Sequence, residues 1–262
     1  MVAFDCHAHV YDRIEAVGSV RYLPTSTAPL GAWLNLQRDH GLAGGVIVQV
    51  SFLGTDNSQL LGALDHLDRA RFAGVAVTGL GASSVELRRL ADGGVRGIRW
   101  NLVAGAPIPN PADPAVAGFL YRLRDHGMHL EVQLESGRLA AALAPLASVA
   151  GVVVVDHFGL PERAEPEEEP WLCALTKMPK RDGIFVKLSA PYRSTVDVVP
   201  HARRLSELLP PDQLLWGSDW PHTRFEDRAS YAGLRDRIAG AVDDEATAHR
   251  LYGLVAAVGA EG

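Results

Sequence analysis

The segment 2-VAFDCHAHV-10 starts with a short apolar run and ends with two histidines one residue apart. Similar runs, rich in β-branched and apolar residues, recur along the chain, and a stretch with helical periodicity follows almost every one. We predict strands at 2–6, 46–50, 72–78, 95–100, 129–134, 152–156, 184–189 and 214–218. We predict helices near 56–70, 83–91, 113–126, 138–148, 170–180, 197–209, 227–240 and 243–257. The first connection, 11–43, is long and contains only a short helical stretch at 33–41.

Strands that alternate with helices indicate βαβ units and a parallel sheet. Eight such units in 262 residues match the count and size of a (β/α)8 TIM barrel. A doubly wound open sheet is the rival, but no G-x-G-x-x-G follows the first strand, and the strand count favours closure. Without an internal repeat or a domain boundary, we expect residues 1–262 to form one barrel domain. The acidic segment 161–171 is expected to be a solvated loop after the sixth strand.

Composition excludes several classes of function. The chain is 47% hydrophobic with a net charge of −6, and it has no cluster of basic residues for nucleic acid or an anionic membrane. Its two cysteines, Cys6 and Cys173, provide no disulfide framework. No apolar run approaches about 20 residues, and no signal peptide is evident. We expect a cytoplasmic protein whose partner is a small molecule.

Polar side chains gather where the predicted strands end, which is where barrel enzymes carry their chemistry. The strand ends offer His7, His9, Gln49, Ser51, Arg99, Asn101, Gln133, Glu135, Asp156, His157, Lys187, Ser189, Tyr192, Arg193, Ser218, Asp219 and His222. This dense set of ionisable groups predicts a functional site at one rim of the barrel. His222, Gln133 and Glu135 fit either a site role or a structural one.

The first strand has polar residues at every second position. Side chains at i and i+2 of a strand share a face, so we expect Asp5, His7 and His9 to point one way, with Asp5 supporting the histidines. Together with His157 and Asp219, two imidazoles at the barrel mouth can hold a metal ion or polarise a carbonyl group. From the residues alone, Asp219 could instead cap the following turn.

Two further alternatives remain structural. Arg99 could pair with a carboxylate in the core of the barrel. The remaining histidines lie on helices or at strand starts, and we expect them to be structural or solvated: His40, His66, His126, His129, His201 and His249.

Several of these motifs occur in an order that resembles a known family. They are DCHAHVYD (5–12), VIVQVSFLGTDN (46–57), VRGIRWN (95–101), VVVDHFGLP (153–161), VKLSAPYR (186–193) and LLWGSDWPHT (214–223). The chain thus resembles the amidohydrolase superfamily, in particular the amidohydrolase-2 group that includes 2-pyrone-4,6-dicarboxylate lactonases and sugar lactonases. The resemblance covers nearly the whole chain and implies a (β/α)8 barrel that hydrolyses lactones.

The resemblance also implies roles for individual residues. His7, His9 and His157 match the histidines that bind the lactone carbonyl, and Asp219 matches the aspartate that activates water. Tyr22, Ser51, Arg99 and Arg193 match substrate contacts, and Gln49, Asn101 and Tyr192 are further candidates from the strand ends.

Two basic residues of the pyrone dicarboxylate lactonases are missing. Gly105 and Leu160 stand near their places, so we expect a substrate with fewer carboxylates, or with one facing solvent.

The question of a cofactor has two answers. His7, His9, His157 and Asp219 could together ligate one Zn²⁺ or another divalent metal. Metal-dependent amidohydrolases commonly add a lysine or glutamate on the fourth strand and a histidine on the fifth. Here Arg99 and Gln133 occupy those places, so we predict that no cofactor is required.

The favoured function is a hydrolase that opens a carboxylated lactone of the pyrone, muconolactone or sugar-acid type. One alternative is a Zn-dependent amidohydrolase or decarboxylase of a small carboxylic acid. A second alternative is a non-catalytic ligand-binding barrel. The sequence does not indicate whether the protein is a monomer or a homo-oligomer.

Overall fold

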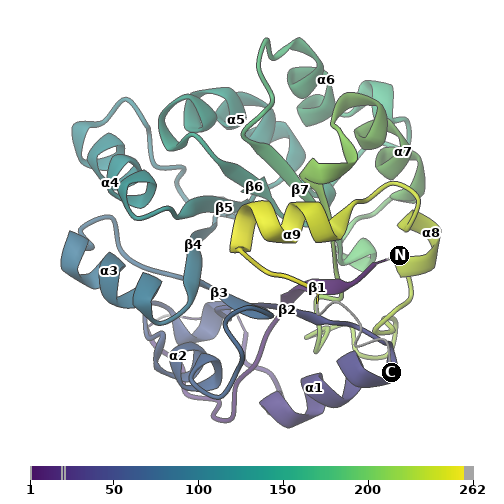
Figure 1. Ribbon diagram of the computed structural model, residues 1–262. Helices are drawn as coiled ribbons and strands as arrows, with labels where there is room; N and C mark the ends of the chain where they lie inside the picture. The colour runs from purple at the N-terminus through teal and green to yellow at the C-terminus, as the bar shows by residue number, and fades with distance from the viewer. Residues whose placement is uncertain (1, 19, 21, 257–262) are drawn as a thin grey trace.

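The computed structural model describes residues 2–18, 20 and 22–256. Its eight parallel strands form one sheet in chain order and enclose a barrel surrounded by helices (Figure 1). The strands are β1 (Phe4–Ala8), β2 (Gly44–Val48), β3 (Phe72–Ala76), β4 (Val95–Asn101), β5 (His129–Gln133), β6 (Val153–Val155), β7 (Ile184–Ser189) and β8 (Leu214–Gly217). The predicted (β/α)8 barrel is confirmed.

The α-helices follow the predicted order with different lengths. They are α1 (Leu30–Asp39), α2 (Ser58–Leu64), α3 (Ser84–Asp92), α4 (Pro114–Asp125), α5 (Ser136–Ala150), α6 (Pro170–Lys177), α7 (Val199–Leu208), α8 (Arg235–Ile238) and α9 (Asp244–Tyr252). The helix expected at 227–240 is reduced to α8, and the one expected at 56–70 is reduced to α2. Among the described residues, no helix combines the length and apolar character needed to cross a membrane.

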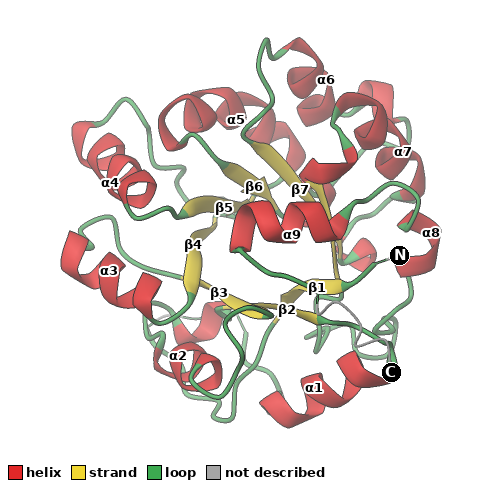
Figure 2. Ribbon diagram, viewed as in Figure 1, coloured by secondary structure: helices red, strands yellow, loops and turns green. Residues whose placement is uncertain are grey.

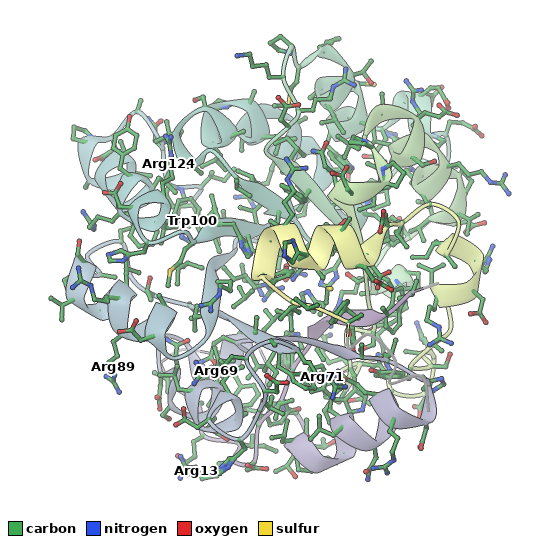
Figure 3. The ribbon with its side chains drawn as sticks, in the orientation of Figure 1. Arg13, Arg69, Arg71, Arg89, Trp100 and Arg124 are labelled. Carbon is green, nitrogen blue, oxygen red and sulfur yellow. The ribbon has the colours of Figure 1, made fainter. Side chains whose placement is uncertain are left out.

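Side chains that alternate along the strands point either to the helices around the barrel or to the barrel interior. Trp100 of β4 points away from the barrel axis toward α4 (Figure 3). Its ring stacks on Phe119 of α4 at 6.1 Å between ring centroids. Its neighbour Arg99 points to the interior, where it meets Asp156. The outer layer holds the helices on the barrel, and the part of the interior around Arg99 holds polar groups.

One end of the barrel is closed. Phe4, Phe185 and Leu215, near the starts of their strands, pack with Tyr252 of α9 in an interior apolar cluster. Figure 2 shows α9 lying across this end of the barrel. The site must therefore lie at the opposite end, where the strands finish.

The barrel closes through hydrogen bonds between the ends of β1 and β8. The amide of Asp219 donates to the carbonyl of His7 (2.8 Å), and the amide of His9 donates to the carbonyl of Trp220 (2.8 Å). The backbone that completes the barrel therefore also fixes three candidate site residues.

The expectation that Asp5 shares a face with His7 and His9 is wrong. The register of β1 against β2 shifts between Asp5 and Ala8, and such a bulge breaks the alternation of side chains. Asp5 therefore accepts hydrogen bonds from Trp33 Nε1 (2.9 Å) and the Tyr231 hydroxyl (2.8 Å), in the layer between barrel and helices. Its supporting role is exerted on the end of β8 instead, because the amide and hydroxyl of Ser218 donate to it (2.8 and 2.7 Å).

Candidate active site

Three histidine nitrogens and one carboxylate oxygen converge at the open end of the barrel. Asp219 Oδ1 lies 3.5 Å from His7 Nε2, 3.5 Å from His9 Nε2 and 3.8 Å from His157 Nε2. His7 lies near the end of β1 and His9 directly after it, His157 begins the 3₁₀ turn after β6, and Asp219 follows β8. The four residues that the sequence analysis selected thus surround one point.

The backbone that presents two of these residues is unusual. His157 (φ 51°) and Asp219 (φ 59°) are both left-handed, although neither is glycine. Such conformations cost about 1–3 kcal/mol each and concentrate at functional sites. The turns after β6 and β8 therefore bend sharply enough to aim both side chains back over the barrel.

The two oxygens of Asp219 have different surroundings. Oδ2 accepts hydrogen bonds from Arg193 Nε (2.8 Å) and the Tyr192 hydroxyl (2.7 Å). Oδ1 is buried and has no hydrogen-bond partner among the described residues. Although burial raises the pKa of Asp219, Arg193 and the neighbouring histidines lower it well below its usual value. The group is an ionised carboxylate at neutral pH with one free oxygen.

Burial keeps His7 and His157 neutral at pH 7, and a hydrogen bond sets the tautomer of His9. Burial lowers the pKa of His157 to about 4, and burial together with Lys187 lowers that of His7 well below its usual value. His9 Nδ1 lies 2.8 Å from the Val48 carbonyl, which can only accept, so this nitrogen carries the proton. A neutral His9 therefore presents a lone pair on Nε2.

The other two rings have partners that allow either tautomer. His157 Nδ1 lies 2.8 Å from Ser189 Oγ, which can donate or accept. His7 Nδ1 lies 3.3 Å from Lys187 Nζ, a donor, and 3.3 Å from Asp156 Oδ1, an acceptor.

A network of buried charges supports the site from inside the barrel. Arg99 Nε lies 2.8 Å from Asp156 Oδ2 and 3.5 Å from Glu131 Oε1, and Lys187 Nζ lies 2.6 Å from Glu131 Oε2. Although burial raises their pKa values, Lys187 lowers the pKa of Glu131, and Arg99 and Lys187 lower that of Asp156. With the pair Arg193–Asp219, three cations offset three carboxylates, so the charges can stay in a low dielectric.

A cavity of about 320 Å³ opens above this network. Its lining includes many of the candidate site residues, namely His9, Tyr22, Ser51, Arg99, Asn101, Gln133, Glu135, His157, Arg193 and Asp219. A neighbouring cavity of about 410 Å³ shares Ser51, Arg99 and Asn101 with it. The first of these cavities, which contains Asp219 and is called the main cavity below, is large enough for a small-molecule ligand.

Comparison with known proteins identifies the family. The family model described as Amidohydrolase matches residues 4–257. The chain belongs to the amidohydrolase family. The 2-pyrone-4,6-dicarboxylate hydrolase of Comamonas testosteroni is 32% identical over 253 residues, 88% of this chain and 81% of that protein. The 4-sulfomuconolactone hydrolase of Rhizobium radiobacter is 30% identical over 86% of this chain and 77% of that protein.

A solved structure is also similar. The probable 2-pyrone-4,6-dicarboxylic acid hydrolase of Acinetobacter baumannii, with citric acid bound, has a TM-score of 0.86 and 27% identity. The match covers 97% of this chain and all of that one. The prediction of a hydrolase of the amidohydrolase group is confirmed.

Some candidate site residues have other partners in this amidohydrolase. Gln49 is absent from the lining of the main cavity, and its Nε2 donates to the carbonyl of Asp56 (2.6 Å) in the loop after β2. Tyr192 reaches Asp219 rather than the cavity, and its hydroxyl lies 3.1 Å from His222 Nδ1. Gln133 accepts from Arg99 Nη2 (2.7 Å). These side chains position other groups.

The sequence analysis missed two kinds of residue. Glu131 is central to the buried network, and its signal was the polar residue at every second position of β5, from His129 to Gln133. His129 is buried at the start of this strand, with its ring centroid 5.2 Å from that of Tyr252. Arg224 and Phe225, just beyond the LLWGSDWPHT motif, line the main cavity, and no strand pattern pointed to them.

Three of the four converging residues also group as ligands for a metal ion. One ligand atom each of His7, His157 and Asp219 lies within 4.8 Å of the others, and His9 Nε2 offers a lone pair beside them. His7 Nε2 and Asp219 Oδ1 are buried without hydrogen-bond partners. Two nitrogens and one oxygen at these separations can hold a zinc ion with bonds of about 2 Å, and His9 Nε2 lies outside the set whose ligand atoms are all within 4.8 Å of one another. A second grouping, His7 with Glu131 and Asp156, fits poorly because the Lys187 ammonium already occupies it.

Proposed function

We propose that this amidohydrolase hydrolyses the ring ester of a small carboxylated lactone. The observation that carries the proposal is the free, ionised Oδ1 of Asp219, which faces three imidazoles at the floor of a cavity lined by arginines. The relatives named for 2-pyrone-4,6-dicarboxylate and 4-sulfomuconolactone hydrolysis support it, because both names describe a cyclic ester that carries acidic groups.

Asp219 is the general base in this proposal. Its Oδ1 takes a proton from water, and the resulting hydroxide attacks the lactone carbonyl carbon. His9, with its lone pair on Nε2, accepts the second hydrogen of the water and orients it. Arg193 and Tyr192 hold Asp219 in place through Oδ2.

Charge develops on the carbonyl oxygen as the water attacks. Neutral His7 and His157, in their Nε2–H tautomers, donate to this oxygen, and such preorganised donors are usually the largest single catalytic term. The tetrahedral intermediate then breaks the ring C–O bond. The departing ring oxygen receives the proton that Asp219 had taken, so the carboxylate is restored.

The rest of the cavity binds the substrate. We assign Tyr22, Ser51, Asn101 and Arg99 to contacts with the ring and its substituents, since all four line the main cavity. Leu160 lines it as well, and Gly105 lines the neighbouring cavity. With these two uncharged residues in the lining, we expect a less highly charged ligand than a pyrone dicarboxylate.

The test is a panel of carboxylated pyrones, muconolactones and sugar-acid lactones, assayed with and without a chelator. Ring opening, followed by loss of lactone absorbance or by acid release, is expected for at least one member and is expected to survive chelation. A protein that opens none of these rings at micromolar concentration would refute the proposal.

A second candidate is a zinc-dependent amidohydrolase or decarboxylase of a small carboxylic acid. It is favoured by His9, because an Nδ1–H that donates to a backbone carbonyl is typical of a metal-ligating histidine. His7, His9, His157 and Asp219 would hold the ion, which would lower the pKa of bound water to about 7. One equivalent of zinc in the purified protein, with activity lost on chelation, would favour this candidate over the first.

A further inference from the structure

Arg224 lies at the mouth of the main cavity without an ionic partner. Its side chain lines the cavity and its residue is exposed to solvent. Within residues 2–18, 20 and 22–256, no carboxylate oxygen lies within 4.0 Å of its guanidinium nitrogens. Its guanidinium carbon lies 5.8 Å from the ring centroid of Tyr22, which lines the same cavity.

The other two arginines of the cavity are already neutralised within the protein. Arg193 pairs with Asp219 at 2.8 Å, and Arg99 pairs with Asp156 at 2.8 Å. The second carboxylate in the lining, Glu135, pairs with Arg138 outside it, also at 2.8 Å. Among the described lining residues, the uncompensated charge is therefore the guanidinium of Arg224.

The loop that carries Arg224 is tied to the proposed base. The amide of His222 donates to the carbonyl of Asp219 (2.9 Å), and the amide of Phe225 donates to that of His222 (2.7 Å). His222 and Arg224 are left-handed (φ 64° and 73°), as is Asp219. The ring centroid of Phe225 lies 5.5 Å from the guanidinium carbon of Arg193. The backbone that carries Arg224 is thus held at a defined place relative to Asp219.

We propose that Arg224 determines substrate specificity by binding the carboxylate of the ligand. This inference rests on the proposed lactonase function. A guanidinium can bind a carboxylate through two parallel hydrogen bonds, and the ring of Tyr22 restricts its freedom before the ligand arrives. Arg99 and Arg193 then serve mainly to hold Asp156 and Asp219, and a single free cation suits a ligand with one carboxylate at the cavity mouth.

The kinetic test compares Arg224→Met and Arg224→Lys with the control Arg228→Met, an exposed arginine outside the cavity lining. Each protein is assayed on a carboxylated lactone and on its methyl ester. For Arg224→Met we expect KM for the carboxylated lactone to rise about tenfold, because the charge-assisted hydrogen bonds of this exposed guanidinium are lost, with kcat little changed. KM for the ester should not move, and Lys should restore part of the difference.

A binding assay separates this inference from the proposed function. Citrate, the ligand named in the structure from Acinetobacter baumannii, is titrated into each protein at low and high salt. We expect Arg224→Met, but not Arg228→Met, to weaken citrate binding about tenfold at low salt, with a smaller effect at high salt because the charge is exposed. If no lactone is opened and citrate binding still depends on Arg224, the lactonase proposal fails while the anion site stands. If Arg224→Met changes neither citrate binding nor the preference for acid over ester, Arg224 is not the anchor.

Discussion

Replacing Asp219 by Asn tests the proposed base with little change of shape. The orientation of the new amide follows from its partners. Arg193 Nε and the Tyr192 hydroxyl both donate to the Oδ2 position, so the amide oxygen must lie there. The amide nitrogen then takes the place of Oδ1, facing His7 and His9, and an acceptor becomes a donor.

The magnitude follows from what is lost. General base catalysis contributes about 10²–10⁴-fold, and here the new N–H₂ group also repels the water hydrogen that Oδ1 would have accepted. We therefore expect Asp219→Asn to reduce kcat by about 10³-fold. KM should change little, because Arg224, Tyr22, Ser51 and Asn101 still contact the ligand.

The assay is kcat on any lactone accepted by the wild-type protein, with citrate binding measured in parallel to show that the site is intact. Asp227→Asn, an exposed residue of the same loop, is the matched control. If Asp219 merely capped the turn after β8, Asn would cap about as well and both readouts would stay unchanged. A variant that keeps more than about a tenth of wild-type kcat would remove Asp219 from the role of base.

Two further predictions concern the buried charges. Lys187→Met leaves the buried carboxylates of Glu131 and Asp156 with less compensating positive charge, so the free energy of unfolding in urea should fall by about 3–5 kcal/mol. The control Lys180→Met, on the exposed segment before β7, should change it by less than about 0.5 kcal/mol. Equal losses in the two variants would mean that the network does not need its lysine. The pKa of His157 falls from 6.5 to about 4 on folding because of burial, so between these values the unfolded chain binds a proton that the folded protein does not. The free energy of unfolding should therefore decrease as pH falls from 6.5 to 4, and His157 should account for about 3 kcal/mol of the decrease at about 1.4 kcal/mol per pKa unit. The variant His157→Gln should show a shallower decrease. An unchanged slope of stability against pH in this variant would contradict a neutral, buried imidazole.

The order of the strands was predictable because each strand is a short apolar run, and the segments between the runs have the hydrophobic periodicity of helices. The ends of helices were less so. Tyr231, Leu234 and Ile238 have helical spacing, yet only Arg235–Ile238 is helical. Tyr231 is drawn instead to the buried carboxylate of Asp5 by a hydrogen bond of 2.8 Å, a tertiary contact that local periodicity cannot reveal.

The candidate site was predictable only in part. His7, His9, His157 and Asp219 follow strand ends, so the position of each was implied by the barrel itself. The bulge in β1 was not, because a register shift leaves no mark in an alternating pattern. The sequence allowed Arg99 to pair with a carboxylate in the core, as it does, but the identity of that partner was hidden, since pairing depends on which strands face each other across the barrel.

Those hidden partners matter most at His7. If Lys187 donates to Nδ1, then Nε2 carries a proton and can stabilise an oxyanion, but Asp156 Oδ1 is left without a hydrogen bond. If Nδ1–H donates to Asp156, then Nε2 presents a lone pair suited to a metal ion, and Lys187 loses one of its acceptors. Each tautomer satisfies one neighbour at the expense of the other, whereas His9 has no such choice. The buried pair beneath His7 therefore leaves its ring able to serve either a carbonyl oxygen or a cation, and the group that binds above it selects the tautomer.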